Sequence, residues 1–175
     1  SKTSYSFNVN YIIRNGFYSR NYLSFELTNL QLPDSLFSTV YNPSYLSSEK
    51  TDLLYPEISF LHKYIKTDNV NYPLKGVMYQ FSISKRGLGW SGDLNMLSLG
   101  VQYNRFFSLG KQYYLSAFTQ NKIKLPFQQA YINMAALGFD DNYLRGLENY
   151  VIDGVAHTLN KFTFSKKLLS ARIKV

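Results

Sequence analysis

The sequence predicts an all-β protein built on an antiparallel sheet, and three observations carry this prediction. Apolar and polar residues alternate with period two along several runs, helical periodicity is nearly absent, and turn signals separate the runs. The run from Ser4 to Tyr11 alternates without a fault between Tyr, Phe or Val and Ser or Asn. A length of 175 residues suits one domain or one piece of a larger domain.

The order of strands follows from these runs and from the residues between them. Asn15 and Gly16 predict a tight hairpin after the first run, because both residues tolerate positive φ. A short turn is expected at 107–110, and long polar or irregular segments are expected at 31–52 and 125–154. The seven expected strands cover about residues 4–11, 23–28, 55–66, 77–84, 97–104, 111–124 and 156–169.

The alternation of short and long connections is typical of outer-membrane barrels, which have short periplasmic turns and longer external loops. A soluble antiparallel barrel or sandwich with its apolar face turned inward gives the same residue pattern, so the pattern alone leaves both folds open. Two details favour the membrane barrel. The polar positions are mostly Ser, Asn, Gln and Thr, and aromatic residues recur near strand ends, where interfacial girdles lie.

Composition excludes several other classes. Charged residues make up 17% of the chain and aromatic residues another 17%, which excludes a charge-rich disordered tail. The longest charge-free run, 125–139, contains Pro126 and is too short for a spanning helix of about 20 residues. The absence of Cys excludes a disulfide scaffold and a Cys-based zinc site. No signal-peptide pattern opens the sequence, so we expect a cytosolic chain or a mature or excised segment.

Signals for enzymatic chemistry and for nucleic-acid binding are weak. His62 and His157 lie in expected strands without a metal-spaced partner, and no nucleophile elbow, phosphate loop or dinucleotide fingerprint occurs. Glu26 and Glu57 are expected to be charges on a barrel lumen rather than paired catalytic carboxylates. The net charge of +8 permits nucleic-acid binding, but an RNA-binding signature strand with intervening helices is absent. We therefore expect no catalytic residue, no metal, no cofactor and no nucleic-acid partner.

The insertion at 125–154 carries the most specific motif, the segment Leu144-Arg145-Gly146-Leu147. It resembles the hydrophobic-Arg-Gly-aromatic motif in the sixth extracellular loop of the BamA/TamA outer-membrane assembly family, also called the bacterial surface antigen family. Leu147 stands in the place of the aromatic residue. Upstream, 72–76 and 81–89 resemble the family's turn and strand that lie three strands before this loop, and 106–111 resembles the next short turn. The resemblance extends from about residue 72 to residue 169.

This resemblance implies a role for the loop residues. In the family, the loop folds back into the barrel lumen, and its arginine pairs with carboxylates on the inner wall. A guanidinium suits such a role because its five donors form a rigid fork, and Gly146 lets the backbone turn tightly. The implied loop-pinning motif is Leu144, Arg145, Gly146 and Leu147. The implied supporting residues of the loop are Asp140, Asp141, Glu148, Asp153 and Gly154.

The resemblance also implies a larger assembly and its activity. Family barrels have sixteen strands, so the chain is expected to be a fragment, residues 1–175, of a partial antiparallel transmembrane β-barrel of about seven strands. Periplasmic domains and gate strands are then absent. The implied function is non-enzymatic insertion or translocation of outer-membrane proteins in the bacterial outer membrane. The implied partners are outer-membrane lipid, unfolded outer-membrane proteins and accessory periplasmic or lipoprotein subunits.

Two alternatives to this function stay open from the sequence. Within the family, the alternative is a two-partner secretion pore or the barrel of a surface-antigen fusion. Outside the family, the alternative is a soluble β-barrel that binds an apolar ligand.

Overall fold

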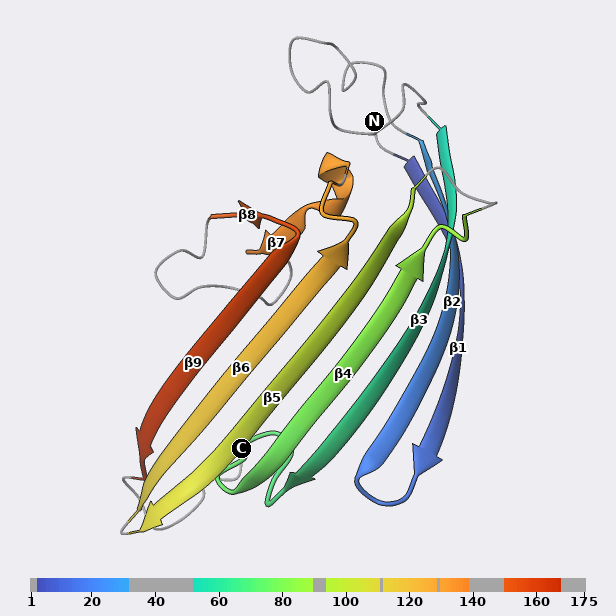
Figure 1. Ribbon diagram of the computed structural model, residues 1–175. Helices are drawn as coiled ribbons and strands as arrows, with labels where there is room; N and C mark the ends of the chain where they lie inside the picture. Colours follow the sequence, from blue (N-terminus) through green and yellow to red (C-terminus); the bar gives the residue numbers. More distant parts are fainter. Residues whose placement is uncertain are drawn as a thin grey trace.

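The computed structural model describes residues 3–31, 52–89, 94–110, 112–128, 130–138 and 150–167, and these residues form an all-β fold (Figure 1). A single short 3-10 helix, η2 (Tyr131–Asn133), is the only helical turn among them. No helix in these ranges is long and apolar enough to cross a membrane. The prediction of an all-β protein is confirmed.

Seven long strands form one antiparallel sheet, in the order β1-β2-β3-β4-β5-β6-β9. Neighbours in the sheet are neighbours in the chain, apart from the pair β6 and β9, which the two-stranded sheet β7-β8 separates in sequence. The strands are β1 (Thr3–Asn15), β2 (Ser19–Gln31), β3 (Asp52–Thr67), β4 (Gly76–Arg86), β5 (Met96–Gly110), β6 (Tyr113–Leu125), β7 (Ala135–Leu137), β8 (Ile152–Asp153) and β9 (Ala156–Lys166).

The two ends of the sheet differ in their connections. At one end, called here the turn end, strands are joined by the segments 16–18, 68–75 and 111–112. At the opposite end, called the loop end, they are joined by 32–51, 87–95 and 126–155. The expected alternation of short and long connections is thereby confirmed.

The expected turn at 107–110 was wrong. Strand β5 continues through these residues, because Phe107 still pairs with Leu115 and Gly110 pairs with Tyr113. The register shifts between Ser108 and Gly110, so an irregularity accommodates the extra residue and the chain reverses between Gly110 and Tyr113. Positive φ values at Gly110 and Gln112 complete that tight reversal.

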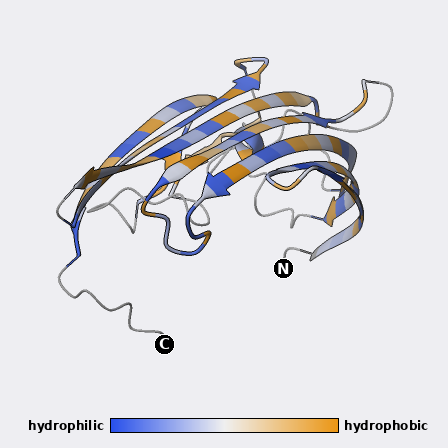
Figure 2. Cartoon of the chain, turned by 90° about the horizontal axis from the view of Figure 1, so that it is seen from below, coloured by the Kyte–Doolittle hydropathy of each residue, from blue (hydrophilic) through white to orange (hydrophobic). Residues whose placement is uncertain are grey.

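The register places apolar and polar side chains on opposite faces of the sheet, seen as alternating bands along the strands in Figure 2. Directly paired residues point to the same side, so each face can be followed across all seven strands. The apolar face includes Tyr5, Phe7, Val9, Tyr11, Leu23, Phe25, Leu27, Ile58, Phe60, Tyr64, Tyr79, Phe81, Ile83, Leu99, Val101, Tyr103, Leu115, Ile123, Phe162 and Phe164. The polar face includes Ser6, Asn8, Asn10, Arg14, Arg20, Ser24, Glu26, Glu57, Ser59, Lys63, Gln80, Ser82, Ser84, Ser98, Gln102, Asn104, Gln120, Lys122, Lys124 and Lys161.

The apolar face is the more exposed of the two, which reverses the usual arrangement of a soluble sheet. Phe7 is 62% exposed and Phe162 is 76% exposed. Along β2 and the first two-thirds of β5, by contrast, polar-face side chains such as Ser24 and Gln102 are less exposed than their apolar neighbours. The sheet is curved (Figures 1 and 2), and this difference is that expected between a convex apolar side and a concave polar side.

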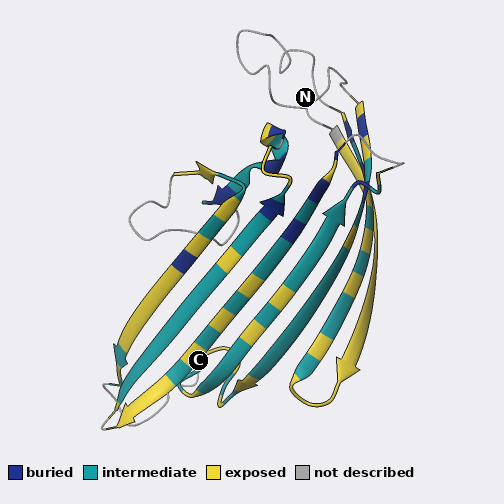
Figure 3. Ribbon diagram, in the orientation of Figure 1, coloured by how far each residue is buried: buried dark blue, intermediate teal, exposed yellow. Residues whose placement is uncertain are grey.

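The buried residues gather at the loop end of the sheet (Figure 3). There, Leu30 and Leu53 pack with Leu94 and with Ala130 from the segment before β7. This small cluster lies on the polar-face side, since Leu30 and Leu53 pair directly and share the phase of Glu26 and Glu57. The principal buried apolar cluster therefore holds the β6–β9 connection rather than the middle of the sheet.

Candidate functional site

The described residues of the connection from β6 to β9, which are 126–128, 130–138 and 150–155, fold back onto the loop end of the polar face. These residues contain η2, β7 and β8, and Ala135 on β7 pairs with Asp153 on β8. One backbone hydrogen bond ties the connection to the sheet, from the Lys124 N–H of β6 to the Val155 carbonyl at 2.7 Å. A second lies within the connection, where the Gly154 N–H donates to the Met134 carbonyl at 2.6 Å. We call the contacts between this connection and the sheet the loop anchor.

Lys124 is the buried cation of the loop anchor. It lies one residue before the end of β6 and is only 5% exposed. Its Nζ donates to the carbonyl oxygens of Asn133 at 2.6 Å and of Ala135 at 2.5 Å. A charged donor between two carbonyls compensates the burial of the ammonium.

Neighbouring charges both repel and attract the ammonium group of Lys124. Lys122 and Arg86 repel its ammonium group, whereas Asp153 on β8 attracts it. Asp153 is exposed, so its attraction is weakened by solvent. The two carbonyl acceptors, rather than an ion pair, therefore hold Lys124 in place.

Arg86 is the second cation of the loop anchor, at the end of β4. Its Nε donates to Glu57 Oε2 at 2.8 Å, and its Nη1 donates to Asn133 Oδ1 at 2.8 Å. The guanidinium also lies over the ring of Tyr55, 5.2 Å from its centroid. Arg86 thus links the sheet carboxylate of β3 to a buried asparagine of the connection, a geometry that the fork of an arginine permits.

Gly138, just after β7, and Tyr150, just before β8, lie close together. Gly138 adopts φ +83°, and a Cβ at this position would lie 2.1 Å from the carbonyl oxygen of Tyr150. The two residues that bracket the segment 139–149 are therefore in close backbone contact. Only glycine fits this approach without displacing the backbone.

All four residues of the loop-pinning motif, Leu144, Arg145, Gly146 and Leu147, lie outside the described residues. Three of the supporting residues, Asp140, Asp141 and Glu148, lie outside them as well. Of the supporting residues, Asp153 and Gly154 are described, and both contact other residues of the connection: Asp153 pairs with Ala135, and the Gly154 N–H donates to the Met134 carbonyl. The inner-wall partner of Arg145 stays a prediction.

Sequence reasoning missed the residues that do hold the connection, namely Lys124, Arg86 and Asn133. One signal was available for the first: Lys124 continues the phase of Gln120 and Lys122 on the polar side of its strand. Nothing in the local sequence indicates that Asn133 meets Arg86, 47 positions earlier in the chain.

The two histidines lie in strands, as expected, on opposite faces of the sheet. His62 is on the apolar face, where its Nδ1 is 2.6 Å from Asn21 Oδ1 and its ring stacks on Tyr79. His157 is on the polar face, opposite Lys122. In the described ranges, no group of three or more His, Asp or Glu side chains is placed to hold a metal ion.

No family model and no curated protein matches this sequence. The BamA/TamA resemblance and the function it implies therefore stay predictions, and the geometry of the sheet is the basis on which they can be argued.

Substituting Gly138 by Ala is expected to loosen the β7-β8 pair. The positive φ costs about 1–2 kcal/mol for any residue with a Cβ, and the contact with the Tyr150 carbonyl adds to that cost. Gly16→Ala is the matched control, since Gly16 has φ +85° and no atom within 4 Å of an added Cβ. Hydrogen exchange at the Gly154 amide measures the difference, and equal exchange rates in the two variants would contradict the close contact.

Proposed function

We propose that this chain forms part of the wall of a transmembrane β-barrel in the bacterial outer membrane, and that the barrel inserts or translocates outer-membrane proteins without enzymatic chemistry. The observation that carries the proposal is the exposed apolar face opposite a concave polar face. An apolar band facing lipid and a polar interior are the defining residue pattern of such barrels. A soluble barrel that binds an apolar ligand needs the reverse arrangement, with apolar residues on the concave side.

The length and connection of the strands agree with this proposal. A tilted strand of about 9–11 residues crosses a bilayer, and the seven strands of the main sheet have 11 to 16 residues each. The turn end would then face the periplasm and the loop end the outside.

An aromatic belt supports a membrane boundary near the turn end. Its members on the apolar face and in the adjoining turn are Phe17, Tyr18, Tyr64, Tyr79, Tyr103, Phe107, Tyr113 and Phe164. Tyr64 and Tyr79 stack at 4.8 Å between ring centroids, and Tyr113 and Phe164 at 5.5 Å. Amphipathic rings prefer the level of the lipid headgroups.

Cations accompany the aromatic belt. Lys66 lies over the ring of Tyr18 at 5.6 Å, and Lys166 lies over the ring of Tyr113 at 5.3 Å. Long basic side chains at the end of an apolar band can extend toward anionic headgroups while their stems contact apolar surface. Outer-membrane lipid is accordingly the first partner that we propose for the apolar face.

Polar side chains that interrupt the apolar face bond to one another. On β6 and β9, Thr158 Oγ1 donates to Asn121 Oδ1 at 2.8 Å, and Asn121 Nδ2 donates to Thr119 Oγ1 at 3.5 Å. On β2 and β3, Asn21 meets His62. Mutual bonding lowers the cost of placing such groups against hydrocarbon.

The edges of the sheet support the proposal that further strands complete a barrel. In the described residues, β1 and β9 have a paired neighbour on one side only. Unpaired backbone groups at such edges are not tolerated in hydrocarbon, and bacterial barrels close with an even number of strands. The sixteen strands of the BamA/TamA family would supply both the missing partners and the lateral gate.

The inward-folded connection favours the assembly family among membrane barrels. The family's sixth loop folds into the lumen, and the segment around Asn133 and Ala135 lies against the polar face through Lys124 and Arg86. Unfolded outer-membrane proteins are then the proposed substrates, with periplasmic or lipoprotein subunits as accessory partners. A two-partner secretion pore or a surface-antigen fusion would share this wall and differ in the flanking domains.

The test is the membrane behaviour of the full-length protein that contains this chain. We expect it to resist alkaline extraction from membranes and to migrate differently on gels before and after heating, as folded outer-membrane barrels do. Arg145→Ala is expected to impair barrel assembly and to reduce the folded, heat-modifiable form. Folding in buffer without detergent or lipid would overturn the barrel, whereas normal assembly of the Arg145 variant would overturn only the pinning role.

A further inference from the structure

One row of the polar face combines three cations that have no carboxylate partner among the described residues. Arg14 on β1 pairs directly with Arg20 on β2, which pairs directly with Lys63 on β3. Directly opposite residues have Cβ atoms about 4.5–5.5 Å apart, and like charges at such positions destabilise a sheet. We call these three residues the cation row.

Carboxylates on the same face lie far from the cation row. Glu26 and Glu57 are each six residues away along β2 and β3, which is about 20 Å at roughly 3.4 Å per residue. Glu57 is also already paired with Arg86. In the turn after β3, Asp68 accepts backbone N–H groups of Asn69, Leu74 and Lys75 through Oδ1.

The local contacts of the cation row do not neutralise its charge. Arg14 Nε donates to the Gly16 carbonyl at 3.2 Å, and its guanidinium lies 5.8 Å from the centroid of the Phe17 ring. Arg20 is exposed. Within the described ranges, neither Arg20 nor Lys63 has an ion-pair partner within 4 Å. Three cations are thus held side by side and open to an external anion.

Three glutamines extend the line of the cation row across β4, β5 and β6, and a pocket lies beside them. Lys63 pairs with Gln80, Gln80 with Gln102, and Gln102 with Gln120. A pocket of about 220 Å³ opens at this point, with Lys63, Gln80 and Gln102 in its lining. Apolar side chains complete the lining, among them Ile65, Met78 and Val70 from the adjoining turn.

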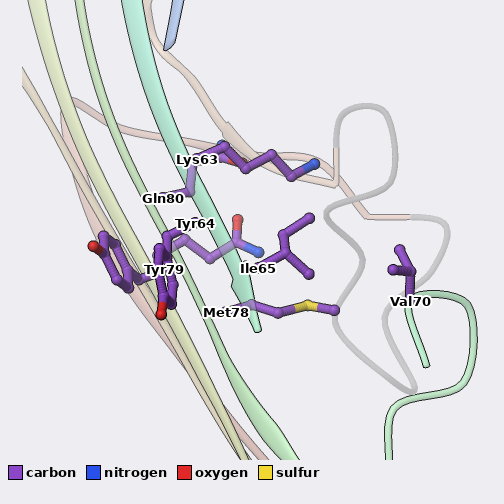
Figure 4. Close-up of a pocket in the computed structure, with 8 residues that line it drawn as sticks. Lys63, Tyr64, Ile65, Val70, Met78, Tyr79 and Gln80 are labelled. Carbon is purple, nitrogen blue, oxygen red and sulfur yellow. The ribbon is translucent and has the colours of Figure 1, made fainter. Parts of the chain in front are cut away.

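The orientation of these side chains places the donors inside the pocket. In Figure 4, Lys63, Ile65 and Met78 project to the side of the sheet on which Val70 lies, whereas the rings of Tyr64 and Tyr79 lie on the other side. This agrees with the register, which puts Lys63 and Gln80 on the polar face and both tyrosines on the apolar face. The pocket therefore opens toward the polar face, next to the cation row.

We propose that the cation row and this pocket bind the oxyanion group of a small ligand, a phosphate or a carboxylate, on the polar face near the turn end. The Lys63 ammonium and the amide groups of Gln80 and Gln102 supply donors at the pocket, and Arg20 supplies a fork of donors beside it. Bound anion would offset the repulsion among the three cations. The apolar lining from Ile65, Met78 and Val70 fits a ligand with a short apolar portion next to its charged group. This site requires no contact of the opposite face with lipid, so it goes beyond the proposed barrel function.

The test is phosphorus NMR of inorganic phosphate titrated with the full-length protein in a non-ionic detergent at low ionic strength. The wild-type protein is expected to broaden the phosphate resonance. The double variant Arg20→Gln/Lys63→Gln is expected to weaken the association about tenfold or more, because it removes two charged donors. Lys161→Gln is the matched control, since Lys161 is on the same face but on β9, at the other side of the sheet, and should bind phosphate as the wild type does.

Folding of the variants can be followed independently of phosphate binding. Without phosphate, Arg20→Gln should raise the unfolding temperature at low ionic strength, since it relieves repulsion between directly opposite cations. The proposal is overturned if the wild-type protein leaves the phosphate resonance sharp, if the double variant broadens it as strongly as the wild type, or if Lys161→Gln loses binding to the same extent. Loss of membrane insertion with retained phosphate binding would overturn the barrel and leave this site standing.

Discussion

Replacing Lys124 by Met is expected to release the β6–β9 connection from the polar face while the seven-stranded sheet persists. The change removes the charged donor shared by the carbonyls of Asn133 and Ala135. Position 124 is buried, so water does not readily replace that donor. A hydrogen bond to a charged group contributes about 1.5–3 kcal/mol. Because burial and repulsion from Arg86 and Lys122 oppose the ammonium, we place the net loss for the two bonds at about 3 kcal/mol.

Hydrogen exchange at the Gly154 amide measures this release. That amide donates to the Met134 carbonyl within the connection, so its exchange reports the opening of the β7-β8 region. A loss of about 3 kcal/mol corresponds to roughly a hundredfold faster exchange if the region opens locally. Amides in the middle of β2 and β3 should keep their wild-type rates.

Lys122→Met is the matched control for this experiment. Lys122 lies two residues earlier on the same strand and the same face, but it is only partly buried. Its removal should leave the Gly154 amide protected or protect it slightly more, because one repulsive charge near Lys124 disappears. Equal acceleration by the two substitutions would mean that net charge, rather than the two carbonyl contacts, holds the connection.

The sheet could be predicted from the sequence because the alternation of residues within each strand assigns them to its two faces. In β2, the order Leu23, Ser24, Phe25 assigns alternate sides without reference to any other strand. Strands were predicted too short where the alternation of apolar and polar residues ends before the strand pairing ends. Ile12 and Ile13 break the pattern of β1, yet both residues remain paired with β2.

The direction of curvature and the loop anchor could not be predicted in the same way. Period two separates two faces but does not indicate which face is concave, since that depends on how seven strands twist together. Likewise, the contact of Arg86 with Asn133 joins positions that are brought together only when β4, β6 and the connection are all in place. The loop motif predicted an inward-folded connection, whereas the contacts described in this fold come from two cations of the sheet, Arg86 and Lys124, whose side chains extend toward the connection.

A lysine placed in the middle of the apolar face is expected to show whether this face contacts lipid or water. Phe25 lies near the centre of β2, directly between Val9 on β1 and Ile58 on β3. If this face contacts hydrocarbon, Phe25→Lys should destabilise the folded barrel by about 2–4 kcal/mol, the cost of a lysine near the bilayer midplane. Urea unfolding of the full-length protein in lipid vesicles measures this cost.

The adjacent position supplies the control, because Ser24 points to the opposite face between Asn10 and Ser59. Ser24→Lys adds the same charge to the same strand among small polar neighbours, and the unfolding free energy should change by less than about 1 kcal/mol. If the apolar face is exposed to water instead, the two lysine substitutions should change the unfolding free energy by similar small amounts. A lysine at position 25 would then be nearly neutral, since an exposed substitution of this kind costs little. A small effect at position 25 in vesicles, equal to that at position 24, would exclude lipid as the medium that covers the apolar face and would remove the main support for a membrane barrel.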